Sequence, residues 1–193
     1  MGAVAVYGGS FDPPHIAHVL VACWARASAG VDRVIVVPTY EHVFDKRSAP
    51  YEDRVHMCEL AMATLEGVEV SRIERTLQES RTLLVLEALQ EANPGADLRL
   101  VIGSDILPST PRWHRWDAVA ALAPPLLVGR RGYPVDEASL KAHGLEEPPL
   151  TMPELSSTDI RRRLQSGQSV AGRVPPEVAE YARSRRLYSA NVE

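Results

Sequence analysis

The sequence predicts an α/β fold built on a doubly wound parallel sheet, with a helical section at its C-terminal end. The first observation is that short β-branched runs recur, at residues 3–7, 33–38, 68–73, 98–103 and 126–129. The second is that the segments between these runs show helical spacing of apolar residues, so helical crossovers are expected to connect parallel strands. Sheets of this kind bind ligands beyond the carboxyl ends of their strands, and functional residues are therefore expected in the loops after the strands.

The intervening segments alternate between helical patterns and loops. Residues 16–23 and 55–62 carry apolar side chains at helical spacing. Residues 39–50 and 130–149 lack such a pattern, and the second of these stretches is rich in glycine and proline. We therefore expect helices in the first pair of segments and surface loops in the second pair.

The C-terminal third of the chain is predicted to be mainly helical. A short strand-like stretch at residues 150–155 precedes two helical patterns, at 156–165 and 175–187. A chain of 193 residues fits one compact domain. We expect residues 1–193 to form a single domain, with residues 155–193 as its C-terminal helical section.

Composition and charge exclude several classes of protein. Apolar residues make up 45% and charged residues 24% of the chain, which is ordinary for a soluble globular protein. The formal net charge of −4, without an arginine-rich tract, gives no electrostatic reason to expect nucleic-acid binding. No apolar run approaches the ~18 residues of a membrane span, and no signal peptide precedes the first strand, so a cytoplasmic protein without membrane attachment is expected. Cys23 and Cys58 have neither disulfide nor metal-site spacing and are expected to be buried thiols. The sequence gives no indication of an oligomeric state.

The turn after the first strand has the residues of a phosphate site. Gly8 and Gly9 allow the backbone to turn sharply and to approach a ligand, and Ser10 and Phe11 follow with amides that can point at it. The helix that begins near His15 presents unpaired amides and the positive end of its dipole, which favour an anion. The sequence contains neither GxGxxG nor GxxxxGK[ST], so this is neither a dinucleotide fingerprint nor a Walker loop.

Two histidines follow this turn. His15 and His18 stand three residues apart and therefore share one face of the first helical turn. Imidazoles in this place can donate hydrogen bonds to phosphate oxygens and, when protonated, offset charge that grows on the phosphates during transfer. The structural alternative is that one histidine caps the helix and the other packs under the loop.

A second anion site is predicted in the stretch SSTDIRRR. Ser156 and the acidic residue three positions later have the S-x-x-[DE] arrangement of a capping box, so a helix starts here. The hydroxyls of Ser156, Ser157 and Thr158, the free amides and Arg161 in the first turn can together hold phosphate groups. The alternative is a capped surface helix with a solvated arginine run.

These motifs resemble a known family. The stretch GGSFDPPHIAH resembles the GG[ST]FDPxHxGH signature of the bacterial nicotinate mononucleotide adenylyltransferases, within the HxGH nucleotidyltransferase superfamily. The stretch LSSTDIRRRL resembles the family's ISSTxIR motif, and VPPEVAEYARSRRLY is similar to its closing helix. The resemblance implies a Rossmann-like fold, ATP with magnesium (Mg2+), and contacts from His15 and His18 to the ATP phosphates. Ala17 stands where the family has glycine, and its methyl group could crowd the adenine or ribose.

The resemblance also assigns roles in the middle of the chain. Lys46 resembles the family's loop lysine, which contacts a phosphate, with His42 in the same loop as the alternative. Gly103 and Asp105 match the GxD motif, whose carboxylate accepts the ribose hydroxyls, and Trp113 matches a tryptophan that stacks on the pyridine ring. The structural alternatives are a solvated lysine, helix capping by Asp105 and core packing of Trp113.

The segment that holds the nicotinate carboxylate in the family matches only in part. Residues 80–86, SRTLLVL, agree with SYTxDTL at three positions, and Thr82 is the acceptor contact that this match implies. Arg81 replaces the aromatic residue, and Leu84 and Val85 replace the polar pair. Arg81 could pair with a carboxylate, but we interpret it as a surface arginine on a helix.

Two further features are interpreted as structural. The run LLVGRRGYP resembles the family's strand followed by a basic turn, in which Arg130 and Arg131 could simply be exposed. Trp116 is expected to pack in the interior.

The sequence therefore predicts an adenylyltransferase of NAD biosynthesis. It would transfer AMP from ATP to nicotinate mononucleotide, forming nicotinate adenine dinucleotide and pyrophosphate. The expected partners are ATP and a small phosphate-bearing mononucleotide. The alternatives are the same chemistry on nicotinamide mononucleotide or phosphopantetheine, a nucleotide-binding paralogue without turnover, and a purely structural domain.

Overall fold

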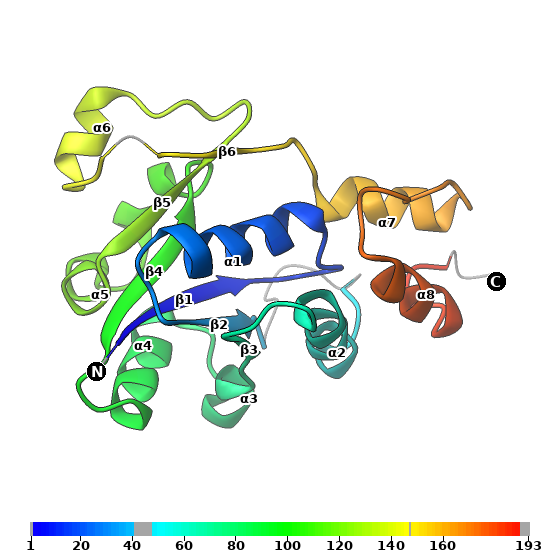
Figure 1. Ribbon diagram of the computed structural model, residues 1–193, viewed down its shortest axis with the longest axis horizontal. Helices are drawn as coiled ribbons and strands as arrows, with labels where there is room; N and C mark the ends of the chain where they lie inside the picture. The colour runs from blue at the N-terminus through cyan, green and yellow to red at the C-terminus, as the bar shows by residue number, and fades with distance from the viewer. Residues whose placement is uncertain (1, 41–47, 147, 190–193) are drawn as a thin grey trace.

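Six parallel strands form one continuous sheet in the part of the chain that the structure describes. The computed structural model describes residues 2–40, 48–146 and 148–189. The sheet has the order β3-β2-β1-β4-β5-β6. Its strands are β1 (Ala3–Gly9), β2 (Arg33–Pro38), β3 (Val68–Val70), β4 (Asp97–Gly103), β5 (Pro125–Arg130) and β6 (Thr151–Met152). The chain first builds from β1 toward one edge and then adds β4 to β6 on the other side, so the strand order reverses between β1 and β4 (Figure 1).

Helices cover both faces of the sheet. They are α1 (Ile16–Ser28), α2 (Tyr51–Met62), α3 (Ile73–Leu77), α4 (Thr82–Ala92), the 3-10 helix η1 (Leu107–Arg112), α5 (Trp116–Leu122), α6 (Glu137–Ala142), α7 (Ser157–Gln165) and α8 (Pro176–Ser184). Residues of α3, α4 and α5 pack on one face, and residues of α1 and α2 pack on the other. The doubly wound, Rossmann-like α/β fold predicted from the sequence is confirmed.

The central strands are buried on both faces, as their near-continuous apolar runs require. In β1, Val4 and Val6 belong to the core cluster under α4 and α5, whereas Ala5 belongs to the cluster under α1. The neighbouring β2 repeats this alternation with Ile35 and Val36. The two cores hold the sheet rigidly, and the loops at its carboxyl edge therefore start from fixed positions.

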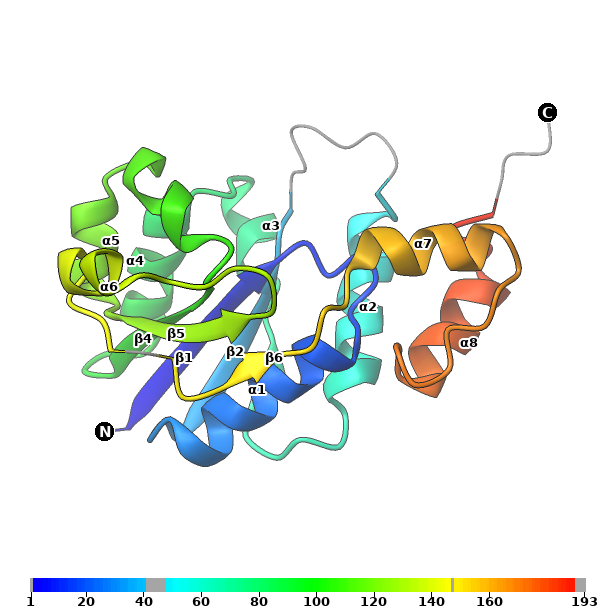
Figure 2. The same cartoon turned by 90° about the horizontal axis from the view of Figure 1, so that it is seen from above.

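The C-terminal helices join the rest of the molecule through α2. Met57 on α2, Ile160 on α7 and Val178 on α8 belong to one buried cluster. The Tyr181 hydroxyl on α8 donates a hydrogen bond to Asp53 Oδ1 on α2 at 2.7 Å. Figures 1 and 2 show α7 and α8 at the end of the molecule that is remote from α5 and α6.

The strand predicted at residues 68–73 is shorter than expected. It ends at Val70, and Ile73 already begins α3. The Ile73 amide donates to the Ser71 hydroxyl at 3.2 Å. This local side-chain bond offers the backbone an alternative to the strand ladder, which ends the strand.

Two other sequence predictions were wrong in part. The loop expected at residues 130–149 contains α6, because the Asp136 carboxylate accepts a hydrogen bond from the Ser139 amide at 2.7 Å and caps a helix. Cys58 is buried as expected, but Cys23 is exposed because it lies on the solvent side of α1.

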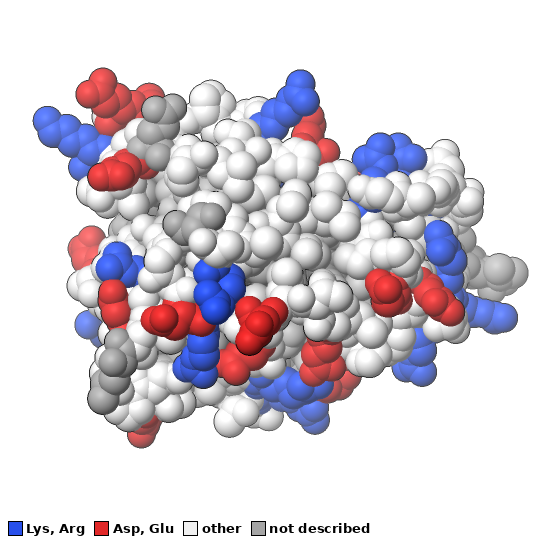
Figure 3. Space-filling model, in the orientation of Figure 1, with Lys and Arg blue, Asp and Glu red and all other residues white. Residues whose placement is uncertain are grey.

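Acidic and basic side chains are interspersed over the face shown in Figure 3. Ion pairs form at the surface, for example between Arg72 and Glu59 at 2.8 Å. Exposed pairs of this kind contribute little to stability. Among the residues that the structure describes, no helix is long and apolar enough to cross a bilayer.

The burial pattern of α4 predicts opposite outcomes for two leucines. Leu86 is fully buried, so Leu86→Ala is expected to lower the free energy of unfolding by about 2–5 kcal/mol. Leu84 on the same helix is 37% exposed, and Leu84→Ala is expected to cost less than about 0.5 kcal/mol. Urea unfolding followed by circular dichroism measures both values. Equal losses for the two variants would contradict the assigned faces of α4.

Candidate active site

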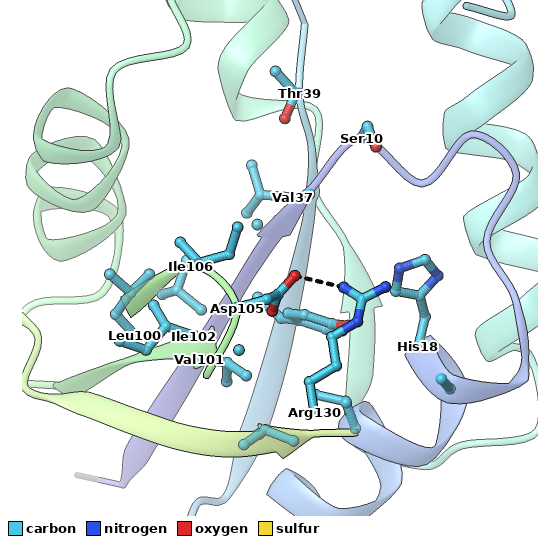
Figure 4. A pocket seen from close by; sticks show the side chains of 18 of the residues that line it. Ser10, His18, Val37, Thr39, Leu100, Val101, Ile102, Asp105, Ile106 and Arg130 are labelled. Carbon is cyan, nitrogen blue, oxygen red and sulfur yellow. Dashed lines mark hydrogen bonds and ion pairs between the residues drawn. The ribbon is translucent and has the colours of Figure 1, made fainter. Parts of the chain in front are cut away.

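A cavity of about 450 Å³ lies at the carboxyl ends of β1 and β4, where the strand order reverses (Figure 4). Doubly wound sheets bind their ligands at this point. The turn after β1, the start of α1, the residues after β4 and the end of β5 all contribute to the wall. Lys46 and its alternative His42 lie outside the described residues, and their phosphate contacts stay predictions.

The turn itself is placed differently from the sequence expectation. Gly8 and Gly9 are the last residues of β1, and the chain turns at Phe11, whose φ of 48° lies in the left-handed region. A side chain at position 9 would come within 3.2 Å of the Phe11 ring, whereas one at position 8 would meet no atom within 4 Å. Gly9 therefore makes room for Phe11, while Gly8 leaves the cavity open. Ser10, between Gly9 and Phe11, also lines the cavity.

The Phe11 ring holds this turn in place. It is 1% exposed and meets the rings of Tyr7 and His18 edge to face, with centroid distances of 5.3 Å and 4.9 Å. A left-handed conformation costs a bulky residue about 1–2 kcal/mol. The buried ring contacts offset that cost and fix the backbone beside the cavity.

His15 and His18 stack on each other at the start of α1. Their ring centroids are 3.7 Å apart and their planes differ by 15°. The His15 amide donates a hydrogen bond to His18 Nδ1 at 3.0 Å. Because Nδ1 accepts, a neutral His18 carries its proton on Nε2 and can donate it to a ligand. His15 is also the N-cap residue of α1, as the structural alternative expected of one histidine, and its phosphate contact stays a prediction.

Both histidines are neutral at physiological pH. Burial, together with the charge of Arg130, lowers the pKa of His15 to about 4. Burial, with smaller contributions from His15 and Arg130, holds the pKa of His18 well below its usual value. Of the two contributions expected from the imidazoles, donation of hydrogen bonds is thus available to the neutral rings, and positive charge in the cavity comes from Arg130.

Arg130, which the sequence left as a residue that could simply be exposed, lines the cavity. Its Nη1 donates to Asp105 Oδ2 at 2.7 Å, and its Nη2 donates to the Leu155 carbonyl at 3.0 Å. The Arg130 amide donates to the Ser104 hydroxyl at 2.8 Å. Figure 4 shows the guanidinium in the cavity beside His18. Its position as the last residue of β5 is the signal that could have identified it, because carboxyl ends of strands carry the ligand contacts.

Asp105 turns its carboxylate into the cavity, where Arg130 binds it. The side chain is only 17% exposed. A side chain at Gly103 would come within 2.4 Å of Asp105 Oδ1. The GxD spacing therefore has a steric reason, because glycine leaves room for the carboxylate two residues later.

The N-terminus of α7 packs against the turn after β1. The Ser157 hydroxyl donates to the Pro13 carbonyl at 3.0 Å. Arg161 Nη1 donates to the Asp12 carbonyl at 2.8 Å, across 149 residues of chain. Arg161 Nη2 also reaches the Thr158 hydroxyl at 3.3 Å. The two phosphate motifs predicted at opposite ends of the sequence thus lie side by side.

The arginine run of α7 is divided between two environments. Ser156 caps the helix by accepting a hydrogen bond from the Asp159 amide at 3.2 Å, as the capping-box pattern predicts. The Asp159 carboxylate binds Arg162 and Arg163 on the helix surface. Arg161 instead donates to the turn after β1, so the alternative of a capped surface helix with a solvated arginine run is right about the cap and does not hold for Arg161.

The opposite wall of the cavity is formed by α4 and the segment after β4. Thr82, the first residue of α4, and Trp113, directly after η1, both line it. The Trp113 ring meets Trp116 edge to face at 5.7 Å, so Trp113 packs on the core and also faces the cavity. Arg81 is exposed and pairs with Glu79 at 3.4 Å, as expected for a surface arginine.

Tyr7, Thr39 and Glu74 also line the cavity, although the sequence analysis did not single them out. Tyr7 and Thr39 come from the carboxyl ends of β1 and β2, and that position could have identified them. Glu74 is 6% exposed and accepts a hydrogen bond from the Tyr40 amide at 2.7 Å. Burial raises the pKa of Glu74. No sequence motif pointed to this carboxylate.

Ala17, which replaces the family's glycine, lies in the wall of the cavity. It is 7% exposed and belongs to the same core cluster as Phe11 and Val21. Its crowding of an adenine or ribose stays a prediction.

Comparisons with known proteins agree with this geometry. The model of the cytidylyltransferase-like family matches residues 6–163. The chain is 42% identical over 189 residues to a probable nicotinate-nucleotide adenylyltransferase of Anaeromyxobacter sp. (strain K), covering 96% of both chains. It is 37% identical over 187 residues to a protein of the same name from Myxococcus xanthus, covering 96% of this chain and 94% of that one.

Solved structures share the fold. The nicotinic acid mononucleotide adenylyltransferase of Plasmodium falciparum complexed with NaAD superposes with a TM-score of 0.85 at 20% identity, covering both chains completely. A putative nicotinate-nucleotide adenylyltransferase of Vibrio parahaemolyticus gives a TM-score of 0.73 at 22% identity, covering 100% of this chain and 98% of that one. The arrangement of strands and helices around the cavity is therefore that of a known fold.

The lowered pKa of His15 predicts how stability depends on pH. Between pH 6.5, the ordinary value, and about 4, the unfolded chain binds a proton that the folded chain does not. The free energy of unfolding should therefore fall as the pH falls through this window, by an amount on the order of 3 kcal/mol from His15 alone. His15→Gln should have a shallower slope in urea unfolding, with the values at pH 8 giving the cost of the substitution itself. Parallel curves for the two proteins would contradict the buried neutral state of His15.

Proposed function

This chain belongs to the nicotinate-nucleotide adenylyltransferase family, and from that premise we propose that it transfers AMP from ATP to nicotinate mononucleotide, forming nicotinate adenine dinucleotide and pyrophosphate. The observation that carries the proposal is that Arg161 and the N-terminus of α7 lie against the turn after β1, beside a cavity at the switch point of the sheet. Two sets of phosphate-binding groups thereby adjoin one cavity. Because α7 supplies one of these sets, we also propose that residues 1–193 act as one nucleotidyltransferase domain.

In the proposed reaction a phosphate oxygen of the mononucleotide attacks the α-phosphorus of ATP in line. The new phosphorus–oxygen bond forms as the bond to the β-phosphate oxygen breaks, and pyrophosphate takes the electron pair and leaves. No covalent enzyme intermediate is required, so the protein contributes by positioning the reactants and stabilising charge. Donors that are fixed before the reaction stabilise that charge without reorganising.

We assign the phosphates of ATP to the start of α1 and to α7. His18 offers Nε2–H as a neutral donor, and His15 stacks beside it. Arg161, with the Ser156, Ser157 and Thr158 hydroxyls at the N-terminus of α7, would hold the β- and γ-phosphates as pyrophosphate departs. The amides of the residues after Gly8 and Gly9 would complete this side of the site.

We assign the ribose of ATP to Asp105 and the acceptor to the opposite wall. The Asp105 carboxylate faces the cavity and can accept hydrogen bonds from two vicinal hydroxyls. Trp113 offers an aromatic face for a pyridine ring, and Thr82 offers a hydroxyl at the start of α4. Arg130 lies beside His18 and is fixed by its pair with Asp105 (Figure 4).

We propose that magnesium enters with ATP. Among the described residues no three histidine, cysteine or carboxylate side chains come together as a metal site. Magnesium binds reluctantly to all-protein cages and commonly keeps water and phosphate ligands. The residues therefore fit an ion held by the ATP phosphates and water, where it would neutralise phosphate charge.

A panel of acceptors tests the proposed substrate. With ATP and magnesium, nicotinate mononucleotide should release pyrophosphate with a kcat/KM at least about tenfold above those of nicotinamide mononucleotide and phosphopantetheine. If another acceptor were preferred, the proposed acceptor would be wrong, and adenylyl transfer from ATP would stand. Binding of ATP in calorimetry without pyrophosphate from any acceptor would show a nucleotide-binding protein without turnover.

Removing the His18 imidazole tests its phosphate contact. His18→Ala should lower kcat at least about 100-fold, because it removes a fixed donor to developing charge. Cys23→Ser on the exposed face of the same helix is the control and should keep the kcat of the wild type. Pyrophosphate release gives the rates, and circular dichroism confirms that both variants fold. A folded His18→Ala protein with wild-type turnover would remove His18 from the site.

A further inference from the structure

Arg54 on α2 is a buried arginine whose guanidinium donates to three backbone carbonyls. It is 2% exposed. Its Nε donates to the Ala49 carbonyl at 3.1 Å, its Nη1 to the Ser10 carbonyl at 2.8 Å and its Nη2 to the Thr39 carbonyl at 2.7 Å. The three carbonyls belong to segments that are separated in sequence, and one side chain joins them.

One of these contacts is matched from the other side by Glu74. Arg54 binds the oxygen of the peptide group between Thr39 and Tyr40, and Glu74 Oε2 accepts a hydrogen bond from the nitrogen of the same peptide group at 2.7 Å. Both side chains are buried. Opposite charges thus hold the two ends of one peptide dipole, which fixes its orientation at the end of β2.

Ala49 is held in a similar way. Its amide donates to Asp12 Oδ1 at 3.1 Å, and its carbonyl accepts from Arg54. Asp12 Oδ1 also accepts a hydrogen bond from the Tyr188 hydroxyl at 2.7 Å. The turn after β1, the end of β2 and the start of α2 are therefore joined through buried charged groups.

Burying these charges is expensive. Apolar residues of similar volume commonly stabilise a fold as well as a buried ion pair does, so stability alone gives little reason for this arrangement. A guanidinium differs from an apolar side chain because its donors form a rigid planar fork that sets the directions of its acceptors. What Arg54 provides is a fixed geometry between Ser10 and Thr39.

The geometry between Ser10 and Thr39 shapes the wall of the cavity. Ser10 and Thr39 both line it and directly follow the neighbouring strands β1 and β2 (Figure 4). Arg54 reaches both carbonyls from α2, behind the cavity wall. The Thr39 amide donates to the Gly9 carbonyl at 2.9 Å, and Arg54 adds a second link, between Ser10 and Thr39, to this backbone contact.

We propose that Arg54 is a positioning residue for adenylyl transfer, with Glu74 as its partner on the Thr39–Tyr40 peptide group. This inference rests on the proposed function. Beyond the backbone bond from Thr39 to Gly9, Arg54 fixes the turn after β1 against the end of β2, and it acts through Ser10 and Thr39 without touching the substrates. Misplacement of reacting groups by about 1 Å lowers the rate of an in-line transfer by about 100-fold, so kcat should respond more than binding.

The test compares Arg54→Lys with Tyr181→Phe. Arg54→Lys keeps the charge but loses the fork, and kcat should fall about 10-fold to 100-fold while the KM values for ATP and acceptor change less than about threefold. Tyr181→Phe removes a different hydrogen bond to α2, that to Asp53, and should keep the kcat of the wild type. Both proteins are assayed well below their melting temperatures. A folded Arg54→Lys protein with wild-type kcat would overturn the proposal.

Glu74 gives a second pair of variants if Arg54→Lys does not fold. Glu74→Gln retains an oxygen that can accept from the Tyr40 amide, and its kcat should be higher than that of a variant without this acceptor. Glu74→Met removes the acceptor and should lower kcat by about tenfold with little change in KM. Equal kcat values for the two Glu74 variants would contradict the role of Glu74 in holding the Thr39–Tyr40 peptide group.

Amide exchange separates this proposal from the proposed function. The amides of Thr39, Tyr40 and Ala49 donate hydrogen bonds in the segments that Arg54 joins. In Arg54→Lys, or in Glu74→Met, their hydrogen exchange measured by NMR should be at least about tenfold faster than in the wild type and in Tyr181→Phe. Unchanged exchange rates of these amides would overturn the proposal that Arg54 and Glu74 fix these segments. If the wild type released no pyrophosphate with any acceptor, the proposed function would fail, and the exchange rates would still decide whether Arg54 fixes these segments.

Discussion

The buried carboxylate of Asp12 is the constraint on which the arrangement of the site depends. It is 1% exposed, and its Oδ1 accepts hydrogen bonds from the Ala49 amide and the Tyr188 hydroxyl. Arg161 lies against its other side, within 3.5 Å of Oδ2. A buried carboxylate that loses its partners is costly, so the start of α2, α7 and the end of the chain must all gather around the turn after β1. The hydrogen bonds and the ion pair of the Asp12 carboxylate therefore bring these segments of the site together.

The charged groups in and beside the cavity are paired in the same way. Arg130 in the cavity is held by Asp105, and Arg161 beside the turn after β1 is held by Asp12. The histidines beside them stay neutral because burial and the neighbouring positive charge both oppose protonation. Neutral donors and fixed cations can share a small space without repelling one another. Such a site is organised for a polyanion before the polyanion arrives.

Local patterns in the sequence predicted the fold and most of the groups around the cavity. The alternation of strands and helices gave the sheet, and the capping pattern at Ser156 gave the start of α7. The sequence did not reveal that Arg130 turns inward, because a residue after a strand can face either solvent or the switch point. Arg54 and Glu74 were also missed, since their partners are backbone groups of distant segments and leave no motif. Contacts between segments that are distant in sequence could therefore not be predicted from local patterns.

The position of Trp113 gives the molecule a built-in optical reporter. The chain has three tryptophans. Trp113 faces the cavity, whereas Trp116 packs behind it and Trp24 lies on α1 among residues of the opposite core. Indole emission is quenched when another aromatic ring stacks on it. Stacking of a ligand ring on Trp113 would therefore be followed by intrinsic fluorescence, without a label and without waiting for a product to form.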